Sequence, residues 1–381
     1  MKFALVAGEA SGDTLGAALM LALRQRHPGA EFIGVGGPKM QALGLTMLAH
    51  AEELAVMGLT EVLAHLPRLL ALRSRLRREL LAGKPDVFVG IDAPEFNLGL
   101  ARWLKRRGLT TVQYVSPQVW AWRQGRVRTM GQAVDLVLCL LPFEPDFYQA
   151  NQLRAEFVGH PLADEIPLVI DRQGARLALG VPAAAKVLAV LPGSRLGEVS
   201  RLGADFAAAA AQFVAAQAAG VRTVVLVPLV NDAVRTLFTE QARIAAIAAE
   251  VRLLDGQAQR ALAAADVVLV ASGTATLETL LCKRPMVVAY RLGAVTAFLL
   301  RRLGLVKVPY FSQPNLLLGE RRVPEFFQEQ VRPAALAVAL AQEIADPARV
   351  QDLERRFLGQ HQRLRRGGAE RAAAAILKLL G

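Results

Sequence analysis

The chain has 381 residues, of which 53% are hydrophobic, which predicts two domains of ordinary size and argues against disorder. Its two cysteines lack the paired spacing of zinc sites or redox motifs, which favours a reducing cytoplasm. The net charge of +12 favours phosphorylated substrates, an anionic membrane face or nucleic acid as partners.

Strand-like and helix-like segments alternate along the chain, which predicts parallel sheets with helices on both faces. The first strand covers residues 3–7 and leads through the loop GEASGD into a helix that ends near Arg26. A second strand over residues 31–35 ends at Gly36. Neither strand is followed by a full G-x-G-x-x-G. The acidic residue that binds the ribose in dinucleotide-binding domains is also missing from the following strand, so we discount NAD.

Residues 69–80 carry leucines at helical spacing, with arginines largely off that stripe, which predicts a basic amphipathic helix. Two interpretations stay open: the helix packs on its own sheet with a solvated arginine face, or it docks on a membrane surface. No apolar run approaches the roughly 20 residues that span a bilayer, so the chain is expected to be soluble or peripheral at most. Nucleic acid ranks below membrane and phosphate, because no nucleic-acid module accompanies the basic clusters.

The buried strand predicted over residues 86–91 delivers Asp92 to its carboxyl end. In open parallel sheets, ligand-handling residues collect just past the carboxyl ends of strands. Asp92 is therefore a candidate general base, and its alternative role is to cap the helix that follows Pro94. Glu95 and His160 are the next candidates, although a lone histidine is more often structural.

A strand over residues 110–115 runs into a loop that contains Trp120, Trp122 and Arg123. These side chains could line a substrate groove, or they could simply pack the loop. An irregular stretch over residues 166–173 then predicts a linker, after which the alternation of strands and helices restarts.

The second half repeats the pattern of strand ends that carry polar groups. Arg195 follows the strand predicted over residues 186–191, where its planar guanidinium could grip a diphosphate. The strand over residues 267–271 stops at Ser272-Gly273-Thr274, where a helix begins; such a helix start attracts phosphate. Glu278 shares a helical face with Thr274 and could accept hydrogen bonds from a ribose. The alternative is that Ser272 caps the helix and Glu278 complements its dipole.

Seven segments spread over most of the chain resemble a known family. They are GEASGD (8–13), AVMG (55–58), GIDAPEFN (90–97), VSPQVWAWR (115–123), LPGSR (191–195), ASGTATLE (271–278) and PNLL (314–317). GIDAPEFN, VWAWR and the order of the motifs are specific, whereas PGSR and SGT fit any nucleotide-sugar enzyme of this class. The chain resembles lipid-A-disaccharide synthases, membrane-associated glycosyltransferases of the GT-B class with two Rossmann-like domains.

The resemblance implies an α/β fold of two doubly wound parallel-sheet domains that face a cleft. Residues 1–165 would bind the acceptor, residues 166–345 the UDP-sugar, and a helical arm over residues 346–381 would pack back on the first domain. Asp92 would be the catalytic residue. The residues implied for the UDP-sugar are Arg195, Ser272, Gly273, Thr274, Glu278 and Asn315. Those implied for the acceptor or membrane side are Ser11, Met57, Arg73, Arg77, Trp120, Trp122 and Arg123.

The implied reaction is an inverting transfer of 2,3-diacylglucosamine from UDP-2,3-diacylglucosamine to 2,3-diacylglucosamine 1-phosphate, which forms the β-1,6-linked lipid A disaccharide and UDP. The nearest match to the D-x-D of metal-dependent glycosyltransferases, Glu144-Pro145-Asp146, reads as a helix start, so neither metal nor cofactor is expected. The expected location is the cytoplasm, peripherally on the anionic inner face of the inner membrane, and a homo-oligomer stays open. A UDP-N-acetylglucosamine epimerase or another UDP-sugar transferase of the same fold is the alternative.

Overall fold

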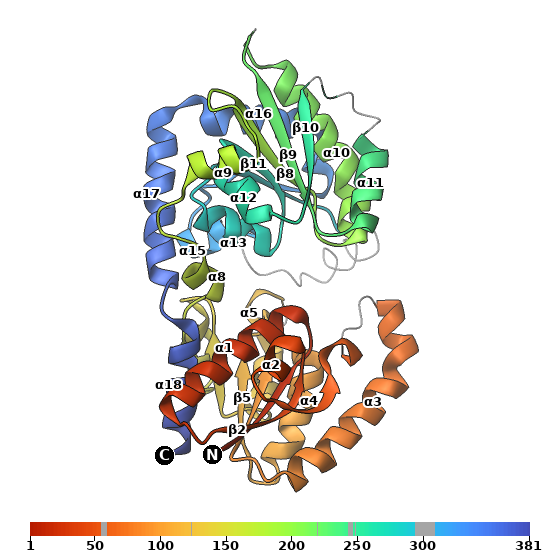
Figure 1. Ribbon diagram of the computed structural model, residues 1–381, viewed down its shortest axis with the longest axis vertical. Coiled ribbons are helices and arrows are strands. Elements are labelled where there is room, and N and C mark those ends of the chain that lie inside the picture. Colours follow the sequence, from red (N-terminus) through yellow and green to blue (C-terminus); the bar gives the residue numbers. More distant parts are fainter. Residues whose placement is uncertain (55–58, 123, 219, 243–246, 248, 294–308) are drawn as a thin grey trace. The chain divides into compact units, whose positions relative to one another are not determined.

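The structure is a computed structural model that describes residues 1–54, 59–122, 124–218, 220–242, 247, 249–293 and 309–381 (Figure 1). For residues 59–66 and 121–122 it describes the backbone alone. The chain divides into two compact units, Met1–Asp164 with Arg363–Gly381, and Glu165–Gln362. Each unit is built on its own parallel sheet, which confirms the predicted pair of doubly wound α/β domains.

The sheet of the first unit has, within the described residues, the strand order β3-β2-β1-β4-β5-β6-β7, and all of these pairs are parallel. Its strands are β1 Lys2–Ala7, β2 Glu31–Gly36, β3 Thr46–His50, β4 Val87–Ile91, β5 Thr110–Tyr114, β6 Leu136–Cys139 and β7 Ala155–Phe157. The chain builds outward from β1 to β3 and then returns to the other side of β1 at β4. The strand order therefore reverses between β1 and β4, which is where ligands bind in open α/β sheets.

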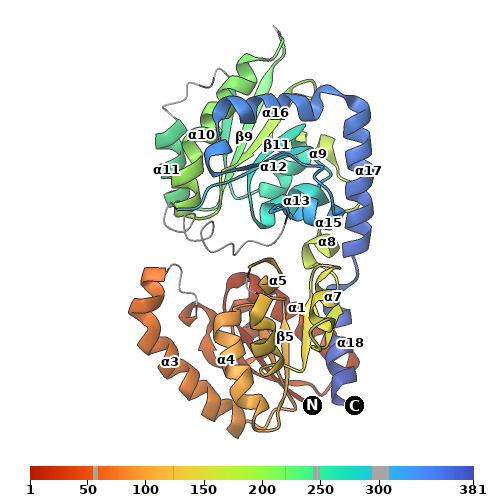
Figure 2. The same ribbon diagram turned by 180° about the vertical axis from the view of Figure 1, so that it is seen from behind.

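Successive residues of β1 point to opposite faces of this sheet, and each face is covered by helices. Phe3 and Leu5 pack in the core formed with α1 (Ala10–Arg26) and α18 (Gly368–Leu380). Val6 packs in the core formed with α3 (Leu59–Ala82) and α4 (Pro94–Lys105). Both views show α1 and α18 on one face of the sheet and α3 and α4 on the other (Figures 1 and 2). The remaining helices of the unit are α2 Pro38–Ala42, η1 Ala51–Glu53, α5 Val119–Trp122, η2 Gln124–Arg126, α6 Val127–Gly131, α7 Glu144–Gln149 and α8 Pro161–Glu165.

The second unit repeats this plan, with the order β10-β9-β8-β11-β12-β13 among its described strands, again all parallel. Its strands are β8 Lys186–Leu191, β9 Thr223–Leu229, β10 Glu250–Asp255, β11 Val267–Ala271, β12 Met286–Tyr290 and β13 Glu325–Phe327. Its helices are α9 Arg172–Ala178, α10 Leu196–Ala215, α11 Asp232–Ala242, α12 Ala258–Ala264, α13 Thr274–Leu281, α15 Gln313–Leu318, η3 Gln328–Gln330, α16 Pro333–Ala345 and α17 Pro347–Leu364. Here the order reverses between β8 and β11.

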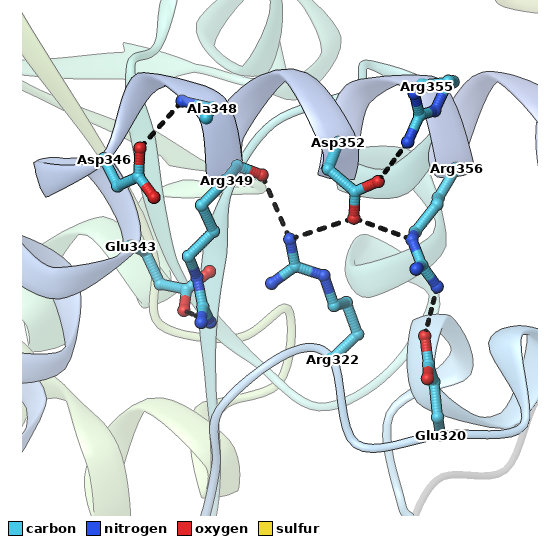
Figure 3. A network of polar contacts seen from close by, with 9 residues as sticks. All are labelled: Glu320, Arg322, Glu343, Asp346, Ala348, Arg349, Asp352, Arg355 and Arg356. Atoms are coloured by element: carbon cyan, nitrogen blue, oxygen red, sulfur yellow. Dashed lines mark hydrogen bonds and ion pairs between the residues drawn. The ribbon is translucent and has the colours of Figure 1, made fainter.

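The C-terminal segment is shared between the two units. Most of α17 belongs to the second unit, where Asp352 accepts hydrogen bonds from Arg322 and Arg356, and Arg356 also pairs with Glu320 (Figure 3). Partly exposed ion pairs of this kind contribute little each, so their main effect is to orient α17 on the unit. After Gln362 the chain joins the first unit, and α18 packs against α1.

Candidate functional site

The loops that follow β1 and β4 meet at the reversal point of the first sheet. A methyl group added to Gly8 would lie 2.6 Å from the Cβ of Ala93, closer than two carbon atoms can approach. A methyl group on Gly12 would lie 3.2 Å from the Cβ of Ala7. Gly8 is therefore required for the close contact between this loop and the loop that carries Asp92, and Gly12 for the close packing of α1 on the end of β1.

Asp92 occupies this reversal point with a strained backbone. Its φ is +52° and that of Ala93 is +40°, a left-handed conformation that costs non-glycine residues about 1–2 kcal/mol each. Burial raises the pKa of the Asp92 carboxyl, and a hydrogen bond from the backbone of Ala93 partly offsets this. The N-cap of α4 is Ala93, and no side chain caps that helix. The structure thus lacks the helix-capping contact that was the alternative role for Asp92.

The two other candidate bases are engaged elsewhere. Glu95 is exposed and accepts two hydrogen bonds from the guanidinium of Arg126, at 2.6 and 2.9 Å. Burial lowers the pKa of His160 to about 4, and its Nδ1 accepts the backbone N–H of Leu162 at 3.2 Å. His160 is therefore neutral at physiological pH and holds the start of α8.

The tryptophan loop of the first unit is tied down by a buried acid. Trp120 is 8% exposed, and its indole Nε1 donates to the Glu144 carboxylate at 3.1 Å. Its ring also meets that of Phe143 edge-on, with the centroids 4.9 Å apart. Trp120 thus packs the loop, which favours the second of the two interpretations of this residue over the acceptor surface. The side chain of Trp122, and all of Met57 and Arg123, lie outside the described residues.

Glu144 should make the stability of the first unit depend on pH. Burial raises the pKa of this carboxyl to about 7 from 4.5. Because the pKa of Glu144 is higher in the folded state than in the unfolded state, its contribution to the free energy of unfolding is fully present below pH 4.5. This contribution, about 3 kcal/mol, is lost as the pH rises through 7. We expect the unfolding temperature of the first unit, measured by calorimetry, to decrease as the pH is raised from 5 to 8 in the native chain. The decrease should be much smaller in Glu144→Gln. Parallel pH dependence in the two proteins would contradict this.

The helix α1 carries one predicted site residue, Ser11, and one polar residue that was not predicted, Asp13. Ser11 is exposed in the first turn of α1. Asp13 is buried, and its carboxylate accepts the backbone N–H groups of Gly37, Lys39 and Met40 at 2.8 to 3.0 Å. Asp13 therefore holds the start of α2, a role that sequence reasoning did not identify because the partner loop lies 24 residues away.

The apolar stripe of the basic helix α3 is used inside the unit. Leu72, Leu76 and Leu80 are buried in the core between α3 and the sheet. Arg77 lies over the ring of Trp103, 5.4 Å from its centroid, while Arg73 is half-buried. These leucines cannot enter a bilayer while the unit is folded, which favours the interpretation in which the helix packs on its own sheet and leaves a solvated arginine face. No helix in the described part of the chain is long and apolar enough to cross a membrane.

The reversal point of the second sheet begins with the loop Pro192–Arg195. Gly193 has φ +130°, and a methyl group there would lie 2.6 Å from the Cβ of Glu198. The Glu198 carboxylate accepts the N–H of Ser194 at 3.0 Å and lies 3.7 Å from Arg195. The side chain of Arg195 is 67% exposed just before α10. Glu198 therefore fixes the loop, while the guanidinium of Arg195 stays accessible to an anion.

The start of α13 forms the other side of this reversal point. Gly273 is the N-cap residue, with φ +154° and open space around its α-carbon, and no side chain caps the helix. Ser272 Oγ donates to the carbonyl of Phe311 at 3.2 Å, so the alternative in which Ser272 caps the helix is not observed. The N–H groups of the first turn are thus available to a phosphate. Thr274 is exposed, and Glu278 lies one turn further along, where burial and then Glu165 raise its pKa.

Asn315 lies beside this edge but is fully buried. Its amide donates to the Val323 carbonyl and to Glu325, both at 2.9 Å, and its Oδ1 accepts the N–H groups of Arg322 and Val323. All four of its hydrogen-bonding positions are therefore filled within the unit. Asn315 holds the PNLL turn and offers no polar atom to a nucleotide in this conformation.

Comparisons with known proteins agree with the resemblance seen in the motifs. A family model described as lipid-A-disaccharide synthetase matches residues 3–376. Lipid-A-disaccharide synthases of Xanthomonas oryzae pv. oryzae and Chromohalobacter salexigens are each 51% identical to the chain, cover 100% of it, and are themselves covered over 87% and 97% of their lengths.

Solved structures share the fold at low identity. The glycotransferase of kitacinnamycin matches with a TM-score of 0.63 at 18% identity, over 100% of this chain and 99% of that one. A UDP-GlcNAc 2-epimerase from Neisseria meningitidis matches with a TM-score of 0.59 at 12% identity, again over 100% and 99%. These likenesses support the two-domain GT-B fold. Given the family match over nearly its whole length, the chain belongs to the lipid-A-disaccharide synthase family of glycosyltransferases.

Proposed function

We propose that the chain transfers 2,3-diacylglucosamine from UDP-2,3-diacylglucosamine to the 6-hydroxyl of 2,3-diacylglucosamine 1-phosphate and releases UDP. The observation that carries this proposal is that the polar groups at the two reversal points suit two different parts of one reaction. The first holds a carboxyl of raised pKa, and the second holds an uncapped helix start beside an exposed arginine. One edge is suited to accept a proton and the other to bind a diphosphate.

The UDP half of the donor is assigned to the second unit. Arg195 and the N–H groups at Gly273 and Thr274 would contact the diphosphate, where they neutralise the charge that develops as UDP leaves. Glu278 would accept hydrogen bonds from the ribose hydroxyls. Ser272 and Asn315 would act indirectly, since Ser272 ties the helix start to Phe311 and Asn315 holds the next turn.

The chemical step is assigned to Asp92. Its carboxylate would take the proton of the acceptor 6-hydroxyl while that oxygen attacks the anomeric carbon and the bond to the UDP oxygen breaks. Attack from the face opposite UDP inverts the anomeric configuration, which gives the β-1,6 linkage. The burial that raises the pKa of Asp92 makes it a stronger base than an ordinary aspartate.

We further propose that the enzyme works peripherally on the cytoplasmic face of the inner membrane, where α3 supplies charge attraction. Leu72, Leu76 and Leu80 of its stripe are buried, but Arg75 and Arg78 remain exposed. Each basic residue near an anionic bilayer contributes about 1 kcal/mol at low salt. We expect Arg75→Ser with Arg78→Ser to weaken sedimentation with anionic vesicles by about tenfold or more at low salt.

The matched control for α3 removes the same charge from the second unit, with Arg260→Ser and Arg355→Ser. Both of these arginines are exposed. Equal loss of vesicle binding in the two double variants would mean that net charge, and not α3, attracts the protein to the membrane. Unchanged binding in the α3 variant would remove the membrane role of that helix.

Incubation of the protein with its two proposed substrates tests the reaction. Purified protein with both acylated sugars should yield a disaccharide 1-phosphate, whose mass is that of the two substrates less UDP, and an equal amount of UDP. Neither product should form when the acceptor is left out. UDP-N-acetylglucosamine serves as the comparison substrate, because an epimerase of the same fold would convert it without an acceptor. Epimer formation without disaccharide would overturn the assignment.

A further inference from the structure

Two buried amide side chains converge on the backbone of Asp92. Asn97 in α4 and Gln113 in β5 are both fully buried. The Asn97 amide donates to the carbonyl oxygen of Asp92 at 2.9 Å, and the Gln113 amide donates to the same oxygen at 3.0 Å. A carbonyl oxygen accepts two hydrogen bonds, so this one is fully occupied by two side chains from different elements.

The same two amides bind the strand ends on both sides of Asp92. Asn97 also donates to the carbonyl of Val6 at the end of β1, at 3.1 Å. Gln113 also reaches the carbonyls of Tyr114 and Val115, at 3.3 Å each. Each amide nitrogen is surrounded by carbonyl oxygens, which determines the end of the amide that donates. The two side chains therefore connect the ends of β1, β4 and β5 at the position of Asp92.

The connected backbone contains strained residues. Asp92, Ala93 and Val115 all have positive φ, at +52°, +40° and +73°, and a β-branched residue such as Val115 rarely adopts this conformation. Such conformations persist only where surrounding contacts determine them. The amides of Asn97 and Gln113 are contacts of this kind, because they bind the carbonyls of Asp92 and Val115 directly.

Apolar packing does not explain the choice of these two residues. In the described part of the chain, neither Asn97 Oδ1 nor Gln113 Oε1 has a hydrogen-bond partner, and a buried unpaired oxygen is unfavourable. Room for them also requires a glycine in β4: a methyl group on Gly90 would lie 2.8 Å from the Cβ of Asn97 and 3.1 Å from Gln113 Oε1. Leucine side chains would fill the same space without these two unpaired side-chain oxygens, but they would leave the carbonyl oxygen of Asp92 without its two donors.

We propose that Asn97 and Gln113 are positioning residues that hold the carbonyl of Asp92 and thereby set the direction of its carboxyl during the reaction. The proposal rests on the role of Asp92 as the base. Both amides are fully buried, so they act on the reaction through Asp92 and not by contact with a substrate. Their loss should lower turnover, because a small misplacement of a reacting group slows a reaction strongly, while substrate affinity should stay nearly constant.

The test compares turnover and KM in variants of these residues. Gln113→Leu and Asn97→Leu remove the donors. Gln113→Asn keeps an amide but shortens the side chain, so it withdraws the donor with less disturbance of folding. We expect each variant to lose about tenfold or more in kcat, with KM for both substrates within about twofold. Turnover close to the native value in Gln113→Asn and in the folded leucine variants would overturn the proposal.

Thr111→Val is the matched control. Thr111 is fully buried on the same face of β5, two residues before Gln113, and its hydroxyl donates to the carbonyl of Ala133 at 3.0 Å. This variant loses a buried hydrogen bond without touching the Asp92 loop. It should lower the unfolding temperature but leave kcat unchanged. An equal loss of kcat in Thr111→Val would mean that the amide variants act through stability alone, which overturns the positioning role.

A double-mutant cycle separates this proposal from the role of Asp92. If Gln113 acts through Asp92, adding Gln113→Asn to Asp92→Asn should lower turnover no further. If the double variant instead shows the product of the two single losses in turnover, Gln113 acts on another step and the proposal is overturned. If Asp92→Asn alone turns over normally, the general base is wrong and the positioning role fails with it. If Asp92→Asn is slow while the amide variants are normal, only the positioning role fails.

Discussion

Asp92→Asn should lower turnover by about 10² or more while UDP binding and the unfolding temperature stay near their native values. Asparagine keeps the shape of the side chain but cannot accept the proton of the acceptor hydroxyl. It also tolerates positive φ better than most residues, so the backbone at +52° gains no strain. Steady-state kinetics with both acylated substrates, combined with calorimetric UDP titration, measure the two effects separately.

Glu95→Gln is the control for Asp92→Asn, because it makes the same chemical change three residues away on an exposed carboxylate paired with Arg126. Its turnover should stay within about threefold of native, since general-base loss costs far more. The pH profile adds a second measurement. Burial raises the pKa of Asp92, so kcat/KM should fall as the pH drops through that raised pKa, above the range of an ordinary aspartate. Near-native turnover in Asp92→Asn would reject the base.

Arg195→Ala should lower kcat/KM by roughly thirtyfold, because a charge-assisted contact with a diphosphate is worth on the order of 2 kcal/mol. The guanidinium is exposed on a loop that Glu198 holds in place, so its removal leaves the loop itself supported. UDP affinity should fall in parallel, since the contact is made to the diphosphate. Calorimetric titration with UDP measures this directly.

Arg195→Lys and Arg222→Ala complete that experiment. Lysine keeps the charge but loses the bidentate geometry, so it should recover only part of the activity. Arg222 is a similarly exposed arginine of the same unit, paired with Glu250, and its replacement should leave UDP binding unchanged. UDP affinity that is equal in the native chain and in Arg195→Ala would remove Arg195 from the donor site.

The sequence alone determined the fold class and the edges where chemistry is expected. Buried strands of parallel sheets read as continuous apolar runs, and their ends are marked by glycine and polar residues. Asp92 after β4, Arg195 after β8 and Ser272 after β11 could therefore be placed at strand ends without coordinates. The reversal-point rule then predicts that such ends handle ligands.

Only the tertiary structure decided which apolar groups are buried and which polar groups are hydrogen-bonded inside the fold. A leucine stripe at helical spacing has the same pattern whether it packs on its own sheet or on a bilayer, and in α3 it packs inside. Trp120 and Asn315 were assigned to ligand surfaces from their motifs, yet their partners Glu144 and Glu325 lie 24 and 10 residues away. The left-handed backbone of Asp92 likewise depends on Asn97 and Gln113. Local periodicity carries no information on such distant hydrogen bonds, because they form only when the strand ends are brought together.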